Sequence, residues 1–258
     1  MANEQKIQQA ARLIRTAQHA VALTGAGIST PSGIPDFRTP GSGLWETSDA
    51  MSVASFWGFV EYPQGFYDWV KPLAKKMLTA QPNSAHRALA ELEAMGRIHA
   101  VITQNIDNLH QRAGSRRVLE VHGHMREATC IRCYHMVPAQ PLLNKFIEDG
   151  VMPTCEICGG VMKPNVVLYG EMLPVSVMYE AEQESKSCDV MLVAGSSLEV
   201  APAADLPLVA KQSGATLIIV NRTSTIADAH AAIVLRDDVA VALPQIVEAV
   251  KNEGKEEN

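Results

Sequence analysis

Residues 20–38, AVALTGAGISTPSGIPDFR, join a short apolar run to a glycine-rich loop. The run AVALT has the length and composition of a buried strand, and Gly25 and Gly27 follow it as in a dinucleotide-binding unit. The sixth position of the G-x-G-x-x-G fingerprint holds Thr30 instead of glycine. A dehydrogenase places an acidic residue about twenty positions further on, after a second strand, whereas Glu46 lies in the loop SGLWETS. The stretch therefore predicts a strand followed by a nucleotide-binding loop, and it disfavours hydride transfer.

Helical and strand-like patterns alternate through most of the chain. Residues 3–18 have apolar side chains at helical spacing, and the capped helical segment 83–95 precedes the apolar run 99–104. Further apolar runs and helical stretches follow in turn at 190–197, 201–212, 216–222, 231–238 and 240–251. This alternation predicts an α/β fold, a Rossmann-like doubly wound parallel sheet.

Polar residues stand at the carboxyl ends of the apolar runs. These pairs are Thr24-Gly25, Gln104-Asn105, Ser196-Ser197, Asn221-Arg222 and Asp237-Asp238. Each pair alone is also typical of a turn or a helix cap. Because the carboxyl ends of parallel strands share one edge of a sheet, the pairs together predict a ligand site at that edge.

The cysteines give the most specific metal signal. Cys130 and Cys133 form one C-x-x-C pair, Cys155 and Cys158 form a second, and 21 residues separate the pairs. Four thiolates complete the tetrahedral coordination of Zn²⁺, so we expect one closed, structural zinc site. A redox role for either pair is the alternative. Cys188, which stands before an apolar run, is expected in the core.

Two stretches interrupt the α/β alternation. Residues 39–79 hold all three tryptophans and predict irregular helices, and residues 124–165 hold the paired cysteines. We expect these stretches to form one smaller inserted domain, made of a helical or lid module (39–79) and a zinc-ribbon module (124–165). The Rossmann-like domain then comprises residues 1–38, 80–123 and 166–258.

Composition limits the classes of partner. The chain has 258 residues, 47% of them hydrophobic, and a formal net charge of -6 spread along its length. We therefore expect no direct binding to duplex nucleic acid, which selects a basic surface. The sequence has neither a long apolar span nor a secretory signal pattern, and it predicts a cytoplasmic protein without membrane contact.

Two further motifs carry candidate chemistry. Gln104, Asn105 and Asp107 in TQNIDNLH follow a predicted strand and offer amide and carboxylate groups to a ribose or carboxamide, although Asp107 also fits a cap. His122, in VHGHM, stands beside a glycine and is a candidate general base, although a lone histidine is often structural. No G-x-S-x-G nucleophile elbow is present, so the sequence offers no candidate for an acyl-enzyme route.

The segments GAGIST, GIPDFR, TQNIDNLH, HG, the two C-x-x-C pairs, GSSLEV and VNR stand in an order that resembles the sirtuins, the NAD-dependent protein deacylases. The resemblance runs from about residue 5 to residue 250. It implies that NAD is bound for cleavage: the acyl oxygen of a modified lysine attacks the ribose as nicotinamide leaves. A histidine then deprotonates a ribose hydroxyl, and the products are O-acyl-ADP-ribose and free lysine.

The resemblance also assigns residues. It implies catalytic roles for His122 and Asn105 and an acyl-lysine tunnel at Val167, Leu168 and Tyr169. The implied NAD contacts are Ala26, Thr30, Asp36, Phe37, Arg38, Gln104, Ile106, Asp107, His122, Ser196, Ser197, Asn221 and Val239. The substrate peptide is expected to add as a strand between 170–173 and 198–202.

Two departures from the family pattern bear on the acyl group. Tyr169 replaces a common phenylalanine, and Tyr67 is followed by Val70 where sirtuins that remove acidic acyl groups have arginine. Acetyl or longer neutral acyl groups are therefore favoured. The alternatives are a mono-ADP-ribosyltransferase using the same NAD pocket, a non-catalytic nucleotide-binding module and, third, a dehydrogenase.

Overall fold

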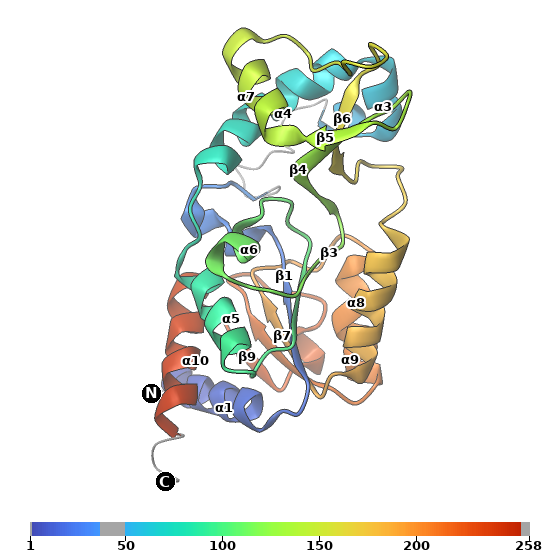
Figure 1. Ribbon diagram of the computed structural model, residues 1–258. Helices are drawn as coiled ribbons and strands as arrows, with labels where there is room; N and C mark the ends of the chain where they lie inside the picture. Colours follow the sequence, from blue (N-terminus) through green and yellow to red (C-terminus); the bar gives the residue numbers. More distant parts are fainter. Residues whose placement is uncertain (1, 37–49, 254–258) are drawn as a thin grey trace.

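The computed structural model describes residues 2–36 and 50–253 (Figure 1). This part of the chain is built on a six-stranded parallel sheet with a separate three-stranded antiparallel sheet. The strand order of the large sheet is β3 (Val118–Glu120), β2 (Ala100–Thr103), β1 (Ala20–Thr24), β7 (Val190–Ala194), β8 (Thr216–Val220) and β9 (Ile233–Leu235). The order reverses between β1 and β7, where ligands bind in doubly wound folds. The predicted Rossmann-like sheet is confirmed.

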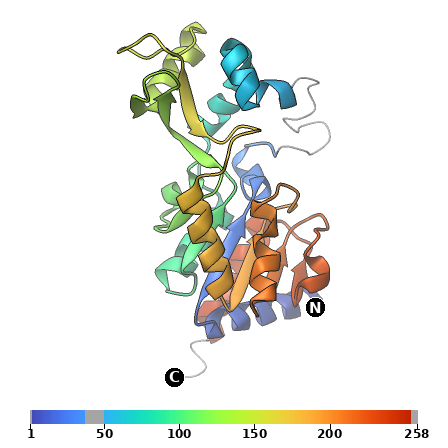
Figure 2. The same ribbon diagram turned by 90° about the vertical axis from the view of Figure 1, so that its right-hand side faces the viewer.

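Alternate side chains of each central strand enter two different cores. Ala20 and Ala22 of β1 pack in one hydrophobic cluster, whereas Val21 and Leu23 pack in the other, as the two-residue period of a strand requires. The first cluster is covered by α1 (Ala2–Thr16), α5 (Ser84–Ala94) and α10 (Val239–Glu253). The second is covered by α8 (Val175–Ser187) and α9 (Leu206–Gln212), which lie in front of the sheet in Figure 2. Burial on both faces explains why the strands are apolar runs without alternation.

The cap of α5 ties this helix to the glycine loop. The Oδ1 atom of Asn83 accepts a hydrogen bond from the Ala85 N–H at 2.8 Å, closing the N-terminus of the helix. Its Nδ2 atom donates to the Ile28 carbonyl at 2.8 Å and to Ser32 Oγ at 2.9 Å. One side chain therefore starts a helix and holds the loop that follows β1.

The small sheet and its helices stand above the large sheet (Figures 1 and 2). Its strand order is β5 (Met136–Pro138), β4 (Gly123–Cys130) and β6 (Met162–Val166), and both pairings are antiparallel. The helices around it are α2 (Ala50–Val53), α3 (Phe56–Glu61), α4 (Pro63–Thr79) and α7 (Ala139–Asp149). Phe59, Phe66, Tyr67 and Phe146 share its core, which joins the two inserted stretches.

The helical stretch is more regular than expected. Residues 63–79 form one continuous 17-residue helix, α4, with Pro72 inside it. The prediction of irregular helices was wrong there, because Phe66, Val70 and Leu73 give a buried face at helical spacing. Residues 39–49 of the expected lid lie outside the described residues, and the domain boundaries stay a prediction.

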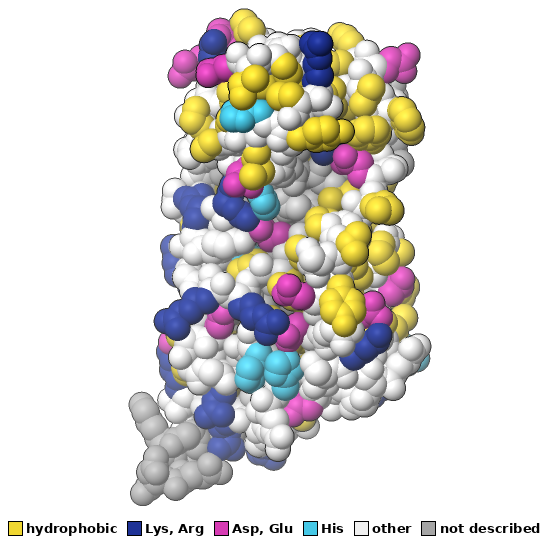
Figure 3. All heavy atoms as spheres, turned by 45° about the vertical axis from the view of Figure 1, so that its right-hand side comes forward, with side chains coloured by type: hydrophobic (Ala, Val, Ile, Leu, Met, Phe, Trp, Pro, Cys, Tyr) yellow, Lys and Arg dark blue, Asp and Glu magenta, His cyan; other side chains and the backbone are white. Residues whose placement is uncertain are grey.

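The surface carries mixed charges. On the face drawn in Figure 3, Lys and Arg side chains are interspersed with Asp and Glu. Within the described ranges, none of the helices is both long and apolar enough to span a bilayer.

Candidate functional site

A cavity of about 990 Å³ opens at the carboxyl edge of the large sheet. Its floor comes from the loops that follow β1, β2, β7 and β8, and its upper wall comes from α4 and residues 166–173. This is the upper end of the ordinary size range of ligand sites, about 300–1,000 Å³. The cavity therefore has room for more than one small group.

The glycine loop is packed against the loop after β7. The Gly27 N–H donates to the Gly195 carbonyl at 2.9 Å. A Cβ atom at Gly27 would lie 2.8 Å from that carbonyl oxygen, and one at Gly25 would lie 2.9 Å from Ser196 Cβ. The two glycines are thus required by the close approach of two loops as well as by access to a ligand.

Most of the predicted ligand residues line this one cavity. They are Ala26, Asp36, Gln104, Asn105, Ile106, Asp107, His122, Val167, Leu168, Tyr169, Ser196, Ser197 and Asn221. They come from segments far apart in the sequence, so the strand order brings them together as expected from the polar strand ends.

Two of the predicted residues are placed differently. Thr30 does not line the cavity; its Oγ1 atom donates to the Gly27 carbonyl at 3.0 Å and so shapes the glycine loop. The side chain of Val239 is buried in the core at the start of α10. Phe37 and Arg38 lie outside the described residues.

The polar pair Asp237-Asp238 is not part of the predicted ligand site, because Asp238 serves as a helix cap. Asp238 Oδ1 accepts from the Ala240 N–H at 2.8 Å at the start of α10, and Asp238 also forms an ion pair with Arg222. Neither aspartate lines the cavity. β9 is the edge strand of the sheet, and its carboxyl end therefore lies away from the switch point between β1 and β7.

A buried polar network forms the floor of the cavity. Ser29 Oγ donates to Asp107 Oδ2 at 2.6 Å and accepts from Asn105 Nδ2 at 3.1 Å. Asn105 Nδ2 also donates to the Gly25 carbonyl at 3.1 Å. Burial raises the pKa of Asp107, and the hydrogen bonds from Ser29 and the Leu109 N–H oppose that rise. The network fixes the side chains of Asn105 and Asp107 in one orientation.

His122 is oriented for proton transfer. Its Nδ1 atom lies 3.0 Å from the Gln104 carbonyl, which can only accept, so Nδ1 carries the proton and Nε2 is left as the basic nitrogen. Burial lowers the pKa of His122, and the hydrogen bond to Gln104 partly restores it. The imidazole is therefore neutral near neutral pH and able to accept a proton.

The predicted acyl tunnel runs beside this histidine. The Val167 N–H donates to the His122 carbonyl at 2.9 Å, and the Tyr169 N–H donates to the Ala54 carbonyl at 3.0 Å. The segment is thus held between His122 and the helical module. Its apolar side chains face the cavity together with Phe66.

The tyrosine of the Tyr67-x-x-Val70 pair turns away from the cavity. Tyr67 Oη donates to the Met162 carbonyl at 2.5 Å, and burial raises the pKa of this phenol. Val70, by contrast, lines the cavity. The wall at this point is apolar.

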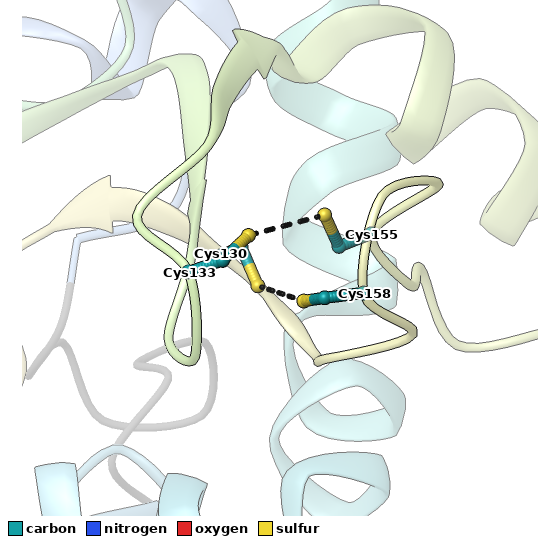
Figure 4. Close-up of side chains that lie close together, drawn as sticks. All are labelled: Cys130, Cys133, Cys155 and Cys158. Atoms are coloured by element: carbon teal, nitrogen blue, oxygen red, sulfur yellow. Dashed lines mark hydrogen bonds between the residues drawn. The ribbon is translucent and has the colours of Figure 1, made fainter.

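The four paired cysteines converge in the small sheet (Figure 4). Their Sγ atoms all lie within 4.8 Å of one another, and the Cys130–Cys158 and Cys133–Cys155 sulfur distances are 3.5 and 3.6 Å. A disulfide has an S–S length of about 2.05 Å, whereas the edge of a ZnS₄ tetrahedron with Zn–S bonds of about 2.3 Å is about 3.8 Å. The cluster fits one structural zinc ion, away from the cavity lining. Cys188 is buried in the core, as predicted.

Several cavity residues escaped the sequence interpretation. Ser29, within GAGIS, joins the buried network, and Gly195 makes the close approach of two loops possible. On α4, Phe66 and Leu73 were missed, and their helical spacing with Val70, which the sequence interpretation had already noted, was the available signal for a wall. The isolated apolar residues Ile34 and Met125 gave no such signal.

Comparisons with known proteins agree with this geometry. The model of the Sir2 family matches residues 25–202. An NAD-dependent protein deacylase 2 from Archaeoglobus fulgidus is 48% identical over 252 residues, which cover 96% of this chain and 97% of the relative.

Two solved structures have the same fold over nearly all of both chains. One is a Sir2 protein with a deacetylated p53 peptide and 3'-O-acetyl-ADP-ribose, with a TM-score of 0.89 and 42% identity, covering 94% of this chain and 97% of the other. The second is Sir2Af2 bound to a myristoylated histone peptide, with a TM-score of 0.85 and 43% identity, covering 98% and 99%. The chain belongs to the Sir2 family, the sirtuins.

Proposed function

We propose that this protein is an NAD-dependent protein-lysine deacylase that transfers the acyl group from lysine to ADP-ribose and releases nicotinamide. The observation that carries the proposal is His122, whose Nε2 is left basic at the cavity of a Sir2-family chain. The related structure with a deacetylated peptide and acetyl-ADP-ribose supports the same reaction class.

The residues of the cavity suit the two halves of such a co-substrate. NAD supplies the glycosidic bond that is broken and the ribose hydroxyls that accept the acyl group. Ser196, Ser197 and Asn221, after β7 and β8, are proposed to hold the adenosine side, with polar groups suited to a nucleoside. Gln104, Ile106 and Asp107 are proposed to hold the nicotinamide ribose and carboxamide, with Ala26 and Asp36 at the glycine loop.

His122 acts in this proposal as general base. Its Nε2 atom accepts the proton of a ribose hydroxyl, while Nδ1 keeps its hydrogen bond to the Gln104 carbonyl. Hydrogen bonds to the Gly25 carbonyl and to Ser29 Oγ hold the side chain of Asn105 in one orientation beside the reacting centre. Val167, hydrogen-bonded to His122, brings the tunnel wall next to the base.

The apolar wall suits a neutral acyl-lysine. Each methylene of the lysine stem or the acyl chain gains about 0.8 kcal/mol on burial. Phe66, Val70 and Leu73 extend this apolar surface beyond Leu168. We therefore propose that neutral acyl groups longer than acetyl also fit, a proposal supported by the myristoylated peptide bound to Sir2Af2.

The charges of the cavity disfavour acidic acyl groups. Besides His122 and Tyr169, the ionisable residues in the described lining are Asp36, Asp107, Glu171 and Glu199. A succinyl carboxylate would meet no lysine or arginine there, and burying an unpaired charge is costly.

The peptide backbone is proposed to bind at the mouth of the cavity. Every residue of the predicted segments 170–173 and 198–202 except the buried Leu198 lines the cavity, and these lining residues are exposed or half-buried. A peptide added as a strand between them would be recognised mainly through its backbone.

Mass spectrometry of an acetyl-lysine peptide incubated with and without NAD tests the proposal. We expect the loss of one acetyl group only with NAD. An ADP-ribosylated protein with an unchanged acetyl peptide would instead identify a mono-ADP-ribosyltransferase, and NADH formation would identify a dehydrogenase.

A further inference from the structure

The peptide group between Gln104 and Asn105 is hydrogen-bonded at both ends. Its carbonyl accepts from Nδ1 of His122 at 3.0 Å, and its N–H donates to Thr103 Oγ1 at 3.1 Å. Thr103 is the last residue of β2 and is 2% exposed. A single rigid amide therefore connects a buried hydroxyl to the imidazole of His122.

The hydroxyl of Thr103 is itself fixed by a hydrogen bond from a second buried threonine. Thr24 Oγ1, at the end of β1, donates to Thr103 Oγ1 at 2.9 Å, and His110 Nε2 lies 2.9 Å from Thr24 Oγ1. Since the Thr24 proton is used toward Thr103, His110 Nε2 is the donor to Thr24. The fully buried His110 packs against His86, with ring centroids 4.9 Å apart.

We propose that Thr103 is a positioning residue for His122, and that Thr24 and His110 hold its hydroxyl in place. None of these three side chains lines the cavity. They act on the reaction through the Gln104–Asn105 amide. The expected effect of Thr103 on kcat rests on the proposed function, whereas its expected effect on the orientation and titration of His122 does not.

The physical basis is the polarisation of the amide. An acceptor on the N–H side increases the negative charge of the carbonyl oxygen, because hydrogen bonds in a chain strengthen one another. A stronger Nδ1–H bond to that oxygen orients the ring and makes Nε2 more basic. Thr103 thus offsets part of the lowering that burial causes in the pKa of His122.

The neighbouring ionisable groups do not mask the effect of Thr103 on the titration of His122. Among the described residues of the cavity lining, the carboxylates are Asp36, Asp107, Glu171 and Glu199, and none of them is a cause of the shifted pKa of His122. Burial, and secondly His86, lowers the pKa of His110 far below its ordinary value. Burial, and secondly Arg87, lowers the pKa of His86 to about 4. Both rings are therefore neutral over the range in which His122 titrates.

The variant Thr103→Val tests the proposal in the full-length, zinc-loaded protein. It keeps the side-chain shape and removes the acceptor from the Asn105 N–H. NMR titration of the His122 Cε1 resonance without NAD should show a pKa about half a unit lower than in the wild type. With acetyl peptide, kcat should fall about tenfold while KM for NAD changes little.

Two further variants separate positioning from stability. Thr103→Ser should restore both readouts, and Thr103→Cys, with its weaker acceptor, should fall between serine and valine even if the valine variant does not fold. Ser185→Ala removes a matched buried hydroxyl, bonded to the Ala181 carbonyl in α8, and should change neither readout. A wild-type titration and a wild-type kcat in Thr103→Val, or in Thr103→Cys, would overturn the inference. Wild-type protein that never deacylates would instead refute the proposed function, and the titration would still report on Thr103.

Discussion

His122 combines a fixed tautomer with a lowered pKa, and these two properties have different structural causes. The tautomer follows from the Gln104 carbonyl at 3.0 Å, and the lowered pKa follows from burial. Sequence alone placed the histidine beside a glycine after a short strand, but it could not show which nitrogen is free. That information depends on a carbonyl 18 residues away in the chain.

The pH profile should report this residue. A general base works when neutral, so kcat/KM should fall as pH decreases through the pKa of His122, below the ordinary value of about 6.5. Measuring kcat/KM for an acetyl peptide between pH 5 and 8 checks this. His122→Ala should lower the rate by about 10²-fold or more and remove that limb of the profile. A substitution that left the rate unchanged would mean that the protein only binds its nucleotide.

Val70 should determine whether the protein prefers neutral or acidic acyl groups. It lines the cavity, while Tyr67 is tied to the Met162 carbonyl. Wild-type protein should favour acetyl and decanoyl peptides over succinyl peptide. Val70→Arg should shift the kcat/KM ratio toward succinyl by about tenfold, because a cation then faces the carboxylate. Val70→Leu serves as the neutral control and should leave the ratio of succinyl to acetyl turnover near that of the wild type.

At the scale of elements, the carboxyl ends of β1, β2, β7 and β8 supply the cavity floor. The periodic patterns predicted these strands because each is buried on both faces. The same reasoning failed to separate Asp237-Asp238 from the other polar pairs, because a helix cap and a ligand residue look alike in sequence. It also missed the regularity of α4, which continues through Pro72 and buries Phe66 and Tyr67 on its inner face.

The cap of α5 gives a prediction at this scale. Asn83→Ala removes the cap and both bonds to the glycine loop, so it should destabilise the protein by about 1–2 kcal/mol and raise KM for NAD. Asn83→Asp keeps the capping oxygen but loses the donors, so it should raise KM with a smaller loss of stability. Urea unfolding and initial-rate kinetics measure the two effects. Equal KM values in both variants and the wild type would contradict a role of this side chain in loop position.

At the scale of the whole molecule, the cavity needs both sheets. The large sheet provides the polar floor, and the core around α4 and β6 provides the apolar wall. The sequence predicted two parts and a four-cysteine zinc site from local patterns. It could not predict that Val167–Tyr169 would pair with both His122 and the helical module, since Val167 lies 45 residues after His122 and Tyr169 lies 115 residues after Ala54.

Zinc removal should therefore act through the fold. Each chain is expected to hold one zinc ion, and chelation or Cys155→Ser should lower the melting temperature and abolish deacylation by loosening the cavity wall. Cys188→Ala, a change of a buried thiol outside the cluster, should keep the full zinc content. Metal analysis with thermal unfolding checks both. Full stability after complete removal of zinc would contradict a structural role.

Quantifying all products of one reaction tests the central claim most directly. Acetyl-lysine peptide and NAD should yield deacetylated peptide, nicotinamide and O-acetyl-ADP-ribose in equal amounts, and His122→Ala should yield little of the last product. Release of free acetate without matching nicotinamide would contradict acyl transfer to ADP-ribose at this cavity.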